Sequence, residues 1–182
     1  MAQARSLAER HLAEELPRRW RHTTSVARRA ADLASLLDVD GPLLVASAWL
    51  HDIGYSPLLV DTGFHPLDGA RFLRRQRVEE RVVCLVAHHS GALIEADERG
   101  LRVNLEAEFA LERSATADAL WYCDMTTGPD GERLSAPDRF DEIRARYGRD
   151  NVVTRFINRA EHELLAAVHR TEERLRLAHS AR

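Results

Sequence analysis

Apolar residues recur at helical spacing along almost the whole chain. Residues 17–37 show this most regularly, because one stripe carries, in order, His22, Val26, Ala30, Leu33 and Leu37. Residues 43–50 differ in being apolar on nearly every side, which is typical of a buried helix. No stretch alternates polar and apolar residues over a useful length, so strands are not expected. The pattern therefore predicts an all-α fold.

Proline, glycine and short polar stretches divide this pattern into separate predicted helices. Their expected ranges are 4–15, 17–37, 42–52, 66–76, 79–89, 114–126, 137–147 and 152–178. Residues 92–105 are the least regular part, and we expect them to cover one side of the domain as a lid. A chain of 182 residues suits one domain, so we predict a single helical bundle over residues 1–182.

Composition and charge narrow the class of protein. Charged residues make up 30% of the chain and hydrophobic residues 45%, which is ordinary for a soluble globular protein. The formal net charge of −3 does not indicate a surface for nucleic acid, and we predict no such partner. All 26 residues counted as lysine or arginine are arginine, a side chain suited to two-pronged binding of phosphate.

Nothing in the pattern indicates a membrane partner or secretion. No apolar run is long enough to span a bilayer, and residues 1–15 lack the apolar centre of a signal peptide. Cys84 and Cys123 lie within apolar segments, so we expect buried free thiols in a reducing compartment. We therefore expect a cytoplasmic protein.

His51 and Asp52 stand side by side at the end of the apolar helix. Burying two ionisable groups costs several kcal/mol unless something pairs with them. Other candidate partners along the chain are His22, His65, His88, His89 and Asp124. Imidazole nitrogens with carboxylate oxygens, and no required thiolate, form a ligand set for zinc, iron, manganese, cobalt or nickel.

Each of these partners also has an ordinary structural explanation. His22 alone fits a core histidine with a hydrogen-bond partner, and Asp124 fits a buried acid paired with arginine. His88 and His89 lie at a predicted helix C-terminus, where the helix dipole favours histidine. His65, before a proline, fits a surface loop. Together these explanations require several separate partners in one small core, whereas a shared metal centre satisfies all of the residues at once.

The order of these residues resembles the HD-domain superfamily of metal-dependent phosphohydrolases. The resembling positions, over about residues 18–126, are His22, His51-Asp52, His65-Pro66, His88-His89 and Asp124. The segment Gly63–Ala70 is similar to the corresponding segment of the branch that binds two metals. The resemblance implies an all-α HD-type domain with a metal-binding core at about 18–126 and an added helical extension at about 137–180.

The resemblance also implies roles for individual residues. The first metal would be held by His22, His51, Asp52 and Asp124. Asp52 would bridge to a second metal, held also by His65 and His88, with His89 as a further ligand or a phosphate contact. We expect two divalent ions drawn from iron, manganese, cobalt, nickel or zinc, with magnesium as a further candidate. The expected catalytic residues are Asp52, His89 and Arg71, the last as a group that neutralises charge on the phosphate.

The chain departs from two patterns within that superfamily. Relatives that cleave cyclic dinucleotides, and several oxygenases, carry a lysine shortly after the His-Asp pair. This chain has Tyr55 there and contains no lysine. The Gly-Tyr-Pro signature of those phosphodiesterases is also absent, because His88-His89 continues into Ser90-Gly91-Ala92. Cleavage of cyclic-di-GMP is therefore not predicted.

The sequence thus favours a metal-dependent hydrolase that cleaves a phosphate ester of a nucleotide or another small phosphorylated metabolite. Two alternatives stay open: a di-iron HD-domain oxygenase acting on a small metabolite, and a non-catalytic nucleotide-binding regulatory module. The same ligands hold iron in both enzyme types, so the ligand set alone does not separate them. The long final helix also leaves a homodimer open.

Overall fold

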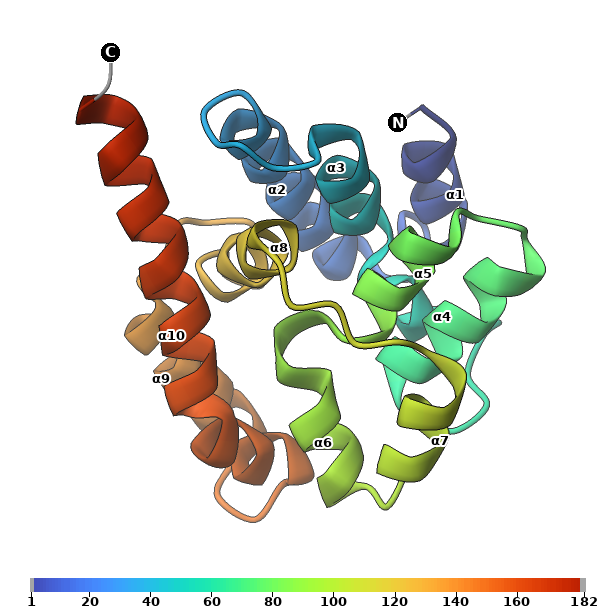
Figure 1. Cartoon of the computed structure of the whole chain (residues 1–182). Helices are drawn as coiled ribbons and strands as arrows, with labels where there is room; N and C mark the ends of the chain where they lie inside the picture. Colours follow the sequence, from blue (N-terminus) through green and yellow to red (C-terminus); the bar gives the residue numbers. More distant parts are fainter. Residues whose placement is uncertain (1, 181–182) are drawn as a thin grey trace.

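Residues 2–180, which the computed structural model describes, fold into helices joined by short loops (Figure 1). In chain order the helices are α1 (Ala2–Leu12), α2 (Pro17–Ala34), α3 (Gly41–Leu50), α4 (His65–Arg75), α5 (Glu80–Ala87), α6 (Ala92–Glu98), α7 (Arg102–Glu108), α8 (Ala115–Met125), α9 (Ala136–Tyr147) and α10 (Val152–Ser180). Two single-turn 3-10 helices are η1 (Ile53–Tyr55) and η2 (His89–Gly91). Within residues 2–180 there is no strand, and β-type pairing is confined to an isolated bridge between Thr127 and Arg133. The all-α prediction is confirmed.

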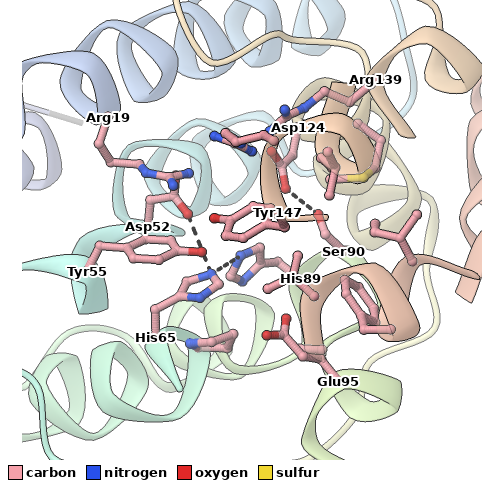
Figure 2. Close-up of a pocket in the computed structure, with 18 residues that line it drawn as sticks. Arg19, Asp52, Tyr55, His65, His89, Ser90, Glu95, Asp124, Arg139 and Tyr147 are labelled. Atoms are coloured by element: carbon pink, nitrogen blue, oxygen red, sulfur yellow. Dashed lines mark hydrogen bonds and ion pairs between the residues drawn. The ribbon is translucent and has the colours of Figure 1, made fainter. Parts of the chain in front are cut away.

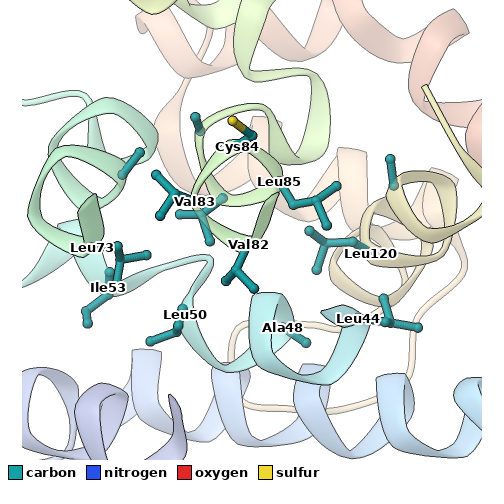
Figure 3. Close-up of a cluster of buried hydrophobic side chains, with 14 of the residues drawn as sticks. Leu44, Ala48, Leu50, Ile53, Leu73, Val82, Val83, Cys84, Leu85 and Leu120 are labelled. Carbon is teal, nitrogen blue, oxygen red and sulfur yellow. The ribbon is translucent and has the colours of Figure 1, made fainter. Parts of the chain in front are cut away.

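Helix α3 lies at the centre of the larger hydrophobic core, with α1, α2, α5 and α8 packed around it. Asp40 caps its N-terminus by accepting a hydrogen bond from the backbone of the first turn, and Pro42 suits that turn. Figure 3 shows apolar side chains of α3, α5 and α8 meeting in this core. Because the helix is covered on several sides, the residues that follow it, His51 and Asp52, lie in the interior.

A second hydrophobic cluster joins α9 and α10 to the end of α8. Its buried members are Met125, Ala136, Phe140, Ile143, Phe156, Ile157, Ala160, Leu164 and Val168. Helix α10, the long red helix of Figure 1, runs along one side of the molecule and packs against α6, α8 and α9. This packing sets α9 and the start of α10 beside the end of α8, where Asp124 lies.

Most predicted helices agree with the structure to within a few residues, and one segment differs. Residues 92–105, predicted to be irregular, contribute to two short helices, α6 and α7. Each of these helices has 7 residues. Two turns are too few for an apolar period to stand out from the sequence.

Two glycines let η1 and α4 approach each other at backbone distance. A Cβ on Gly54 would lie 2.0 Å from the carbonyl oxygen of His65, and one on Gly69 would lie 3.0 Å from the backbone nitrogen of Gly54. No side chain fits at Gly54, so the close contact itself requires a glycine. The contact brings the chain that follows Asp52 against the first turn of α4.

Cys84 and Cys123 are buried and free, as the sequence predicts. Burial raises the pKa of both thiols, to about 12 at Cys123, so both stay protonated. Among the described helices, none combines the length and the apolar character needed to cross a membrane.

Candidate metal centre

Three buried histidines are anchored to the backbone in the same way. In each ring Nδ1 lies next to a backbone carbonyl oxygen: His22 at 2.9 Å from Gly128, His51 at 2.8 Å from Ala48 and His89 at 2.6 Å from Val86. A carbonyl group only accepts, so the hydrogen-bond network assigns the Nδ1 proton in each ring. In the neutral ring Nε2 then carries the free lone pair. Backbone-anchored imidazoles of this kind are typical of metal ligands.

The first group of candidate ligands consists of His22, His51 and Asp124. One ligand atom from each residue lies within 4.8 Å of the others. Nε2 of His22 is 3.0 Å from Oδ1 of Asp124, and Nε2 of His51 is 3.9 Å from the same oxygen. Helix α2, the end of α3 and helix α8 therefore converge at this point.

The second group consists of Asp52, His65 and His89. Oδ1 of Asp52 lies 3.5 Å from Nε2 of His65, and that nitrogen lies 3.2 Å from Nε2 of His89. Oδ2 of Asp52 lies 3.3 Å from Nε2 of His51 and 3.8 Å from Nε2 of His22. Asp52 thus stands between the two groups, with one oxygen near each.

Buried positive charge balances the two buried aspartates. Burial raises the pKa of Asp52, but Arg19, whose Nη1 is 2.9 Å from Oδ2, and His51 bring that pKa well below its ordinary value. Burial likewise opposes ionisation of Asp124, and its contacts with His22 and His51 lower its pKa. Burial also disfavours charge on His51, yet the neighbouring Asp52 raises its pKa to about 9. Both aspartates are therefore ionised at neutral pH.

The two histidines that face each other favour the neutral form. Burial lowers the pKa of His65 well below its ordinary value, and the neighbouring His89 lowers it further. Burial lowers the pKa of His89 in the same way, with a smaller contribution from His51. Neutral imidazole is the form that binds metals.

These donors fit a divalent metal. Nε2 of His51 is buried and makes no hydrogen bond within the described residues, although oxygens of Asp52 and Asp124 lie 3.3 and 3.9 Å from it, and a cation bound between these groups would satisfy all three. His22 faces an acceptor at both ring nitrogens, Gly128 on one side and Asp124 on the other, so a neutral ring needs a cation on its Nε2 side. Imidazole nitrogen and carboxylate oxygen suit zinc and the first-row transition metals. The expectation of divalent metal is supported, and the number and identity of the ions stay predictions.

The structure corrects the position expected for His88. This residue is buried, but Nε2 of its ring lies 2.9 Å from the carbonyl oxygen of Phe109, and the ring belongs to neither group of ligands. His88 ends α5, whereas His89 begins η2 and turns its Nε2 toward His65. His89 therefore takes the place that the sequence assigned to His88.

Arg71 also lies away from the ligands. Its guanidinium binds Glu108 at 2.9 and 2.5 Å and Asp61 at 3.1 Å. It does not line the cavity beside the two groups. The expectation that Arg71 neutralises charge within the site is corrected, because two surface acids already hold this side chain.

Arg19, Tyr55 and His65 form a stack beside Asp52 (Figure 2). The guanidinium of Arg19 lies 4.0 Å from the centroid of the Tyr55 ring, a distance typical of a cation–π contact. The ring of Tyr55 in turn stacks on His65, with centroids 3.9 Å apart and planes 17° apart. Burial raises the pKa of Tyr55, so its hydroxyl stays protonated. The stack fixes the orientation of the His65 ring.

Ser90 holds Asp124 from an uncommon backbone conformation. Its φ of 48° and ψ of 44° lie in the left-handed region, which costs a non-glycine residue about 1–2 kcal/mol. Its Oγ donates a hydrogen bond to Oδ2 of Asp124 at 2.5 Å. Strained residues of this kind cluster at functional sites.

A cavity opens beside the two groups of ligands (Figure 2). Its inner side is formed by Asp52, His65, His89, Ser90 and Asp124. The C-terminal helices contribute Arg139, Ile143, Arg146, Tyr147, Val153, Phe156 and Ile157. Helix α6 adds the carboxyl group of Glu95, whose pKa burial raises while its partner Arg99 opposes the shift. The segment predicted to be a lid thus lines part of the cavity through Ala92 and Glu95.

Six polar cavity residues were not anticipated from the sequence: Arg19, Ser90, Glu95, Arg139, Arg146 and Tyr147. Arg19 precedes His22 by three residues, a spacing that places both on one face of α2 and is visible in the sequence. Ser90 directly follows His89, and the other four lie on α6 and α9, which approach the ligands only through tertiary packing. No local pattern marks them.

The fold and the site define an all-helical protein with a buried histidine–aspartate cluster suited to divalent metals. The chain belongs to the HD domain family, whose profile matches residues 19–135. The matched segment contains every member of the two candidate ligand groups and ends directly before α9.

Two curated relatives share part of this sequence. The tRNA (cytidine(56)-2'-O)-methyltransferase of Thermoplasma volcanium is 39% identical over 77 residues, which cover 42% of this chain and 22% of that protein. The protein of the same name from Picrophilus torridus is 32% identical over 102 residues, which cover 54% of this chain and 29% of that protein. The chain thus spans roughly a quarter of the length of these relatives. No solved structure matches.

Proposed function

We propose that the protein is a metal-dependent phosphohydrolase that cleaves a phosphate ester of a small metabolite, with a nucleotide as one candidate. The observation that supports this most strongly is the position of Asp52, whose two oxygens lie near two separate groups of ligands. Paired metal sites of this kind are used by enzymes that hydrolyse phosphate esters. The first ion would be held by His22, His51 and Asp124, and the second by His65 and His89, with Asp52 between them.

Divalent ions bound there would supply positive charge for the phosphate oxygens and acidity for an attacking water molecule. In the reaction the water oxygen forms a bond to phosphorus, the ester P–O bond breaks, and the departing alkoxide takes up the proton that the water releases. Arg19 keeps Asp52 ionised and in place between the two groups. Tyr147 lines the cavity (Figure 2), and we propose that its hydroxyl donates to a phosphate oxygen of the substrate.

The activity named for the two relatives is not proposed for this chain. The shared segments make up 22% and 29% of those proteins, so the name describes much longer chains. The HD profile covers residues 19–135 here, and its histidines and aspartates form the cluster described above. Buried metal ligands support hydrolysis rather than methyl transfer.

Phosphate release from nucleoside monophosphates and simple phosphomonoesters tests the proposal, with manganese, iron(II), cobalt, zinc or magnesium added in turn. Asp52→Asn keeps the size of the side chain and removes its charge. We expect a loss of at least about 10²-fold in kcat, the scale of losing one charged group from a preorganised site.

Asp130→Asn is the matched control, because Asp130 is an exposed acid that pairs with Arg18 and Arg21 on the surface. It should keep the wild-type rate. Wild-type turnover in Asp52→Asn would falsify the proposed role of Asp52, and the absence of phosphate release with every metal and ester would count against the hydrolase itself.

A further inference from the structure

Arg139 is a buried arginine that the protein does not fully satisfy. Its side chain lines the cavity and the residue is only 3% exposed. Its Nη1 donates to Glu142, while its Nε is buried and has no hydrogen-bond partner within residues 2–180. An unpaired N–H on a buried guanidinium is costly, so a native structure with one calls for a partner. Figure 2 shows this side chain on the wall formed by α9.

The charges on this wall do not cancel. Arg146, about two turns after Arg139 on α9, also lines the cavity and contacts Glu142, with its Nε 3.3 Å from Oε1. Glu142 is the acid recorded for both arginines among the described residues, so two cations share one carboxylate. The other acids at the cavity have partners of their own: Asp52 contacts Arg19, Glu95 contacts Arg99, and Asp124 contacts His22 and His51.

The side chains that line the cavity indicate which kind of ligand the excess positive charge of Arg139 and Arg146 would attract. An arginine with free N–H groups recognises planar or tetrahedral oxyanions, phosphate above all, through paired hydrogen bonds. A cation is disfavoured beside two guanidinium groups, and an apolar group would leave Nε of Arg139 unsatisfied. The same cavity is also lined by the candidate metal ligands Asp52, His65, His89 and Asp124. A phosphate group therefore suits both the two arginines and the candidate metal ligands.

We propose that Arg139 and Arg146 form an anion subsite that binds a phosphate group of the substrate from the α9 side of the cavity. Identification of the anion as the substrate's phosphate rests on the proposed phosphohydrolase function. Both arginines lie beyond residues 19–135, so this subsite belongs to the C-terminal helices of this chain rather than to the part matched by the family profile. The ligands expected for this subsite are phosphorylated substrates.

Binding of inorganic phosphate to the full, chelator-treated chain tests the subsite without turnover or metal. Calorimetric titration at low ionic strength should detect phosphate binding to the wild type. Arg139→Gln should bind phosphate about 10- to 100-fold more weakly, the value of a hydrogen bond to a charged group. Arg149→Gln, which removes the same charge from an exposed position just after α9, should bind as the wild type does.

Glu142→Gln separates recognition from a structural role. Removing this acid leaves both arginines uncompensated, so phosphate should bind severalfold more tightly. If Glu142 only held the two side chains in place, its loss would weaken binding instead. Where Arg139→Gln does not fold, Arg146→Gln gives the same test at a position nearer the rim. A wild type that binds no phosphate, or an Arg139→Gln chain with unchanged affinity, overturns the subsite.

Kinetic measurements separate the proposed anion subsite from the proposed hydrolase activity. In a chain that hydrolyses phosphate esters, Arg139→Gln should raise KM for the ester by about 10-fold or more with unchanged metal content. If the chain binds phosphate through Arg139 but hydrolyses no ester, the proposed subsite stands and the proposed hydrolase activity is wrong. If the chain hydrolyses esters and Arg139→Gln leaves KM unaltered, the proposed hydrolase activity stands and the proposed subsite is wrong.

Discussion

His88 and His89 are adjacent, yet their rings have opposite relations to the candidate metal centre. His89 gives Nδ1 to the carbonyl of Val86 and leaves Nε2 facing His65. His88 gives Nε2 to the carbonyl of Phe109, and its Nδ1 is buried without a partner within residues 2–180. The direction of the nitrogen that the backbone leaves free therefore decides which histidine is available as a ligand: in His89 it faces His65, and in His88 it belongs to neither ligand group.

Exchanging each histidine for glutamine should separate a ligand from a structural residue. His89→Gln should lose metal from the second group, so elemental analysis should find about one ion fewer per chain than in the wild type. His88→Gln should keep its metal content and lose stability by about 1–3 kcal/mol, because a buried hydrogen bond to the backbone disappears. Equal metal loss in both variants would contradict the assignment.

The sequence shows the pair but not which member faces the ligands. Helix α5 ends at Ala87, and the next residues leave helical geometry: His88 has φ −114° and ψ 14°, and Ser90 is left-handed. Helical periodicity therefore no longer fixes the side-chain directions. Arg71 illustrates the same limit, because its acids, Asp61 and Glu108, come from segments that only the fold brings near.

Gly54 should be intolerant of any side chain, because η1 and α4 touch through their backbones there. In Gly54→Ala the new Cβ meets the carbonyl of His65, so the two elements must move apart. We expect a loss of about 1–3 kcal/mol or more in the free energy of unfolding. The same movement separates Asp52 from His65, so metal binding by the second group should also weaken. Denaturant unfolding and metal titration measure the two effects.

Gly100→Ala is the control for this steric effect. Gly100 has a positive φ of 70° but nothing within 4 Å of a Cβ, so its substitution costs only backbone strain. That variant should lose about 1–2 kcal/mol of stability and bind metal normally. Unchanged metal affinity in Gly54→Ala would show that the close approach does not set the distance between Asp52 and His65.

The helices themselves were largely readable from the sequence, and the reason is their length. Helices α2, α3, α8 and α10 have 10 residues or more, so caps, prolines and apolar repeats identify each of them. Helices α6 and α7 have 7 residues and escaped prediction. Four residues predicted as ligands lie on these long helices or directly after one, and the structure brings them close together: His22, His51, Asp52 and Asp124.

Two parts of the chain cooperate to make the site. Residues 19–135, which match the HD profile, supply both ligand groups, whereas α9 and α10 supply the wall with Arg139 and Tyr147. The second hydrophobic cluster holds these helices in place through Phe140, Phe156 and Leu164. The sequence predicted α9 and α10 as helices but not their contact with the ligands. An amphipathic pattern shows which face of a helix is buried, but not which part of the protein packs against that face.

Removing the metal should lower the thermal stability of the whole chain. The candidate ligands come from α2, α4, α8, η2 and the turn that follows α3, so an ion bound between them stabilises the folded chain but not the unfolded one. At a free concentration of about 100 times Kd, each site adds about 2.7 kcal/mol, or roughly 5–10 °C in Tm for a chain of this length. Calorimetry before and after chelation, and again after manganese or zinc is restored, measures this difference. Asp130→Asn should show the full difference and Asp52→Asn a much smaller one, whereas a wild-type Tm that ignores metal would contradict both ligand groups.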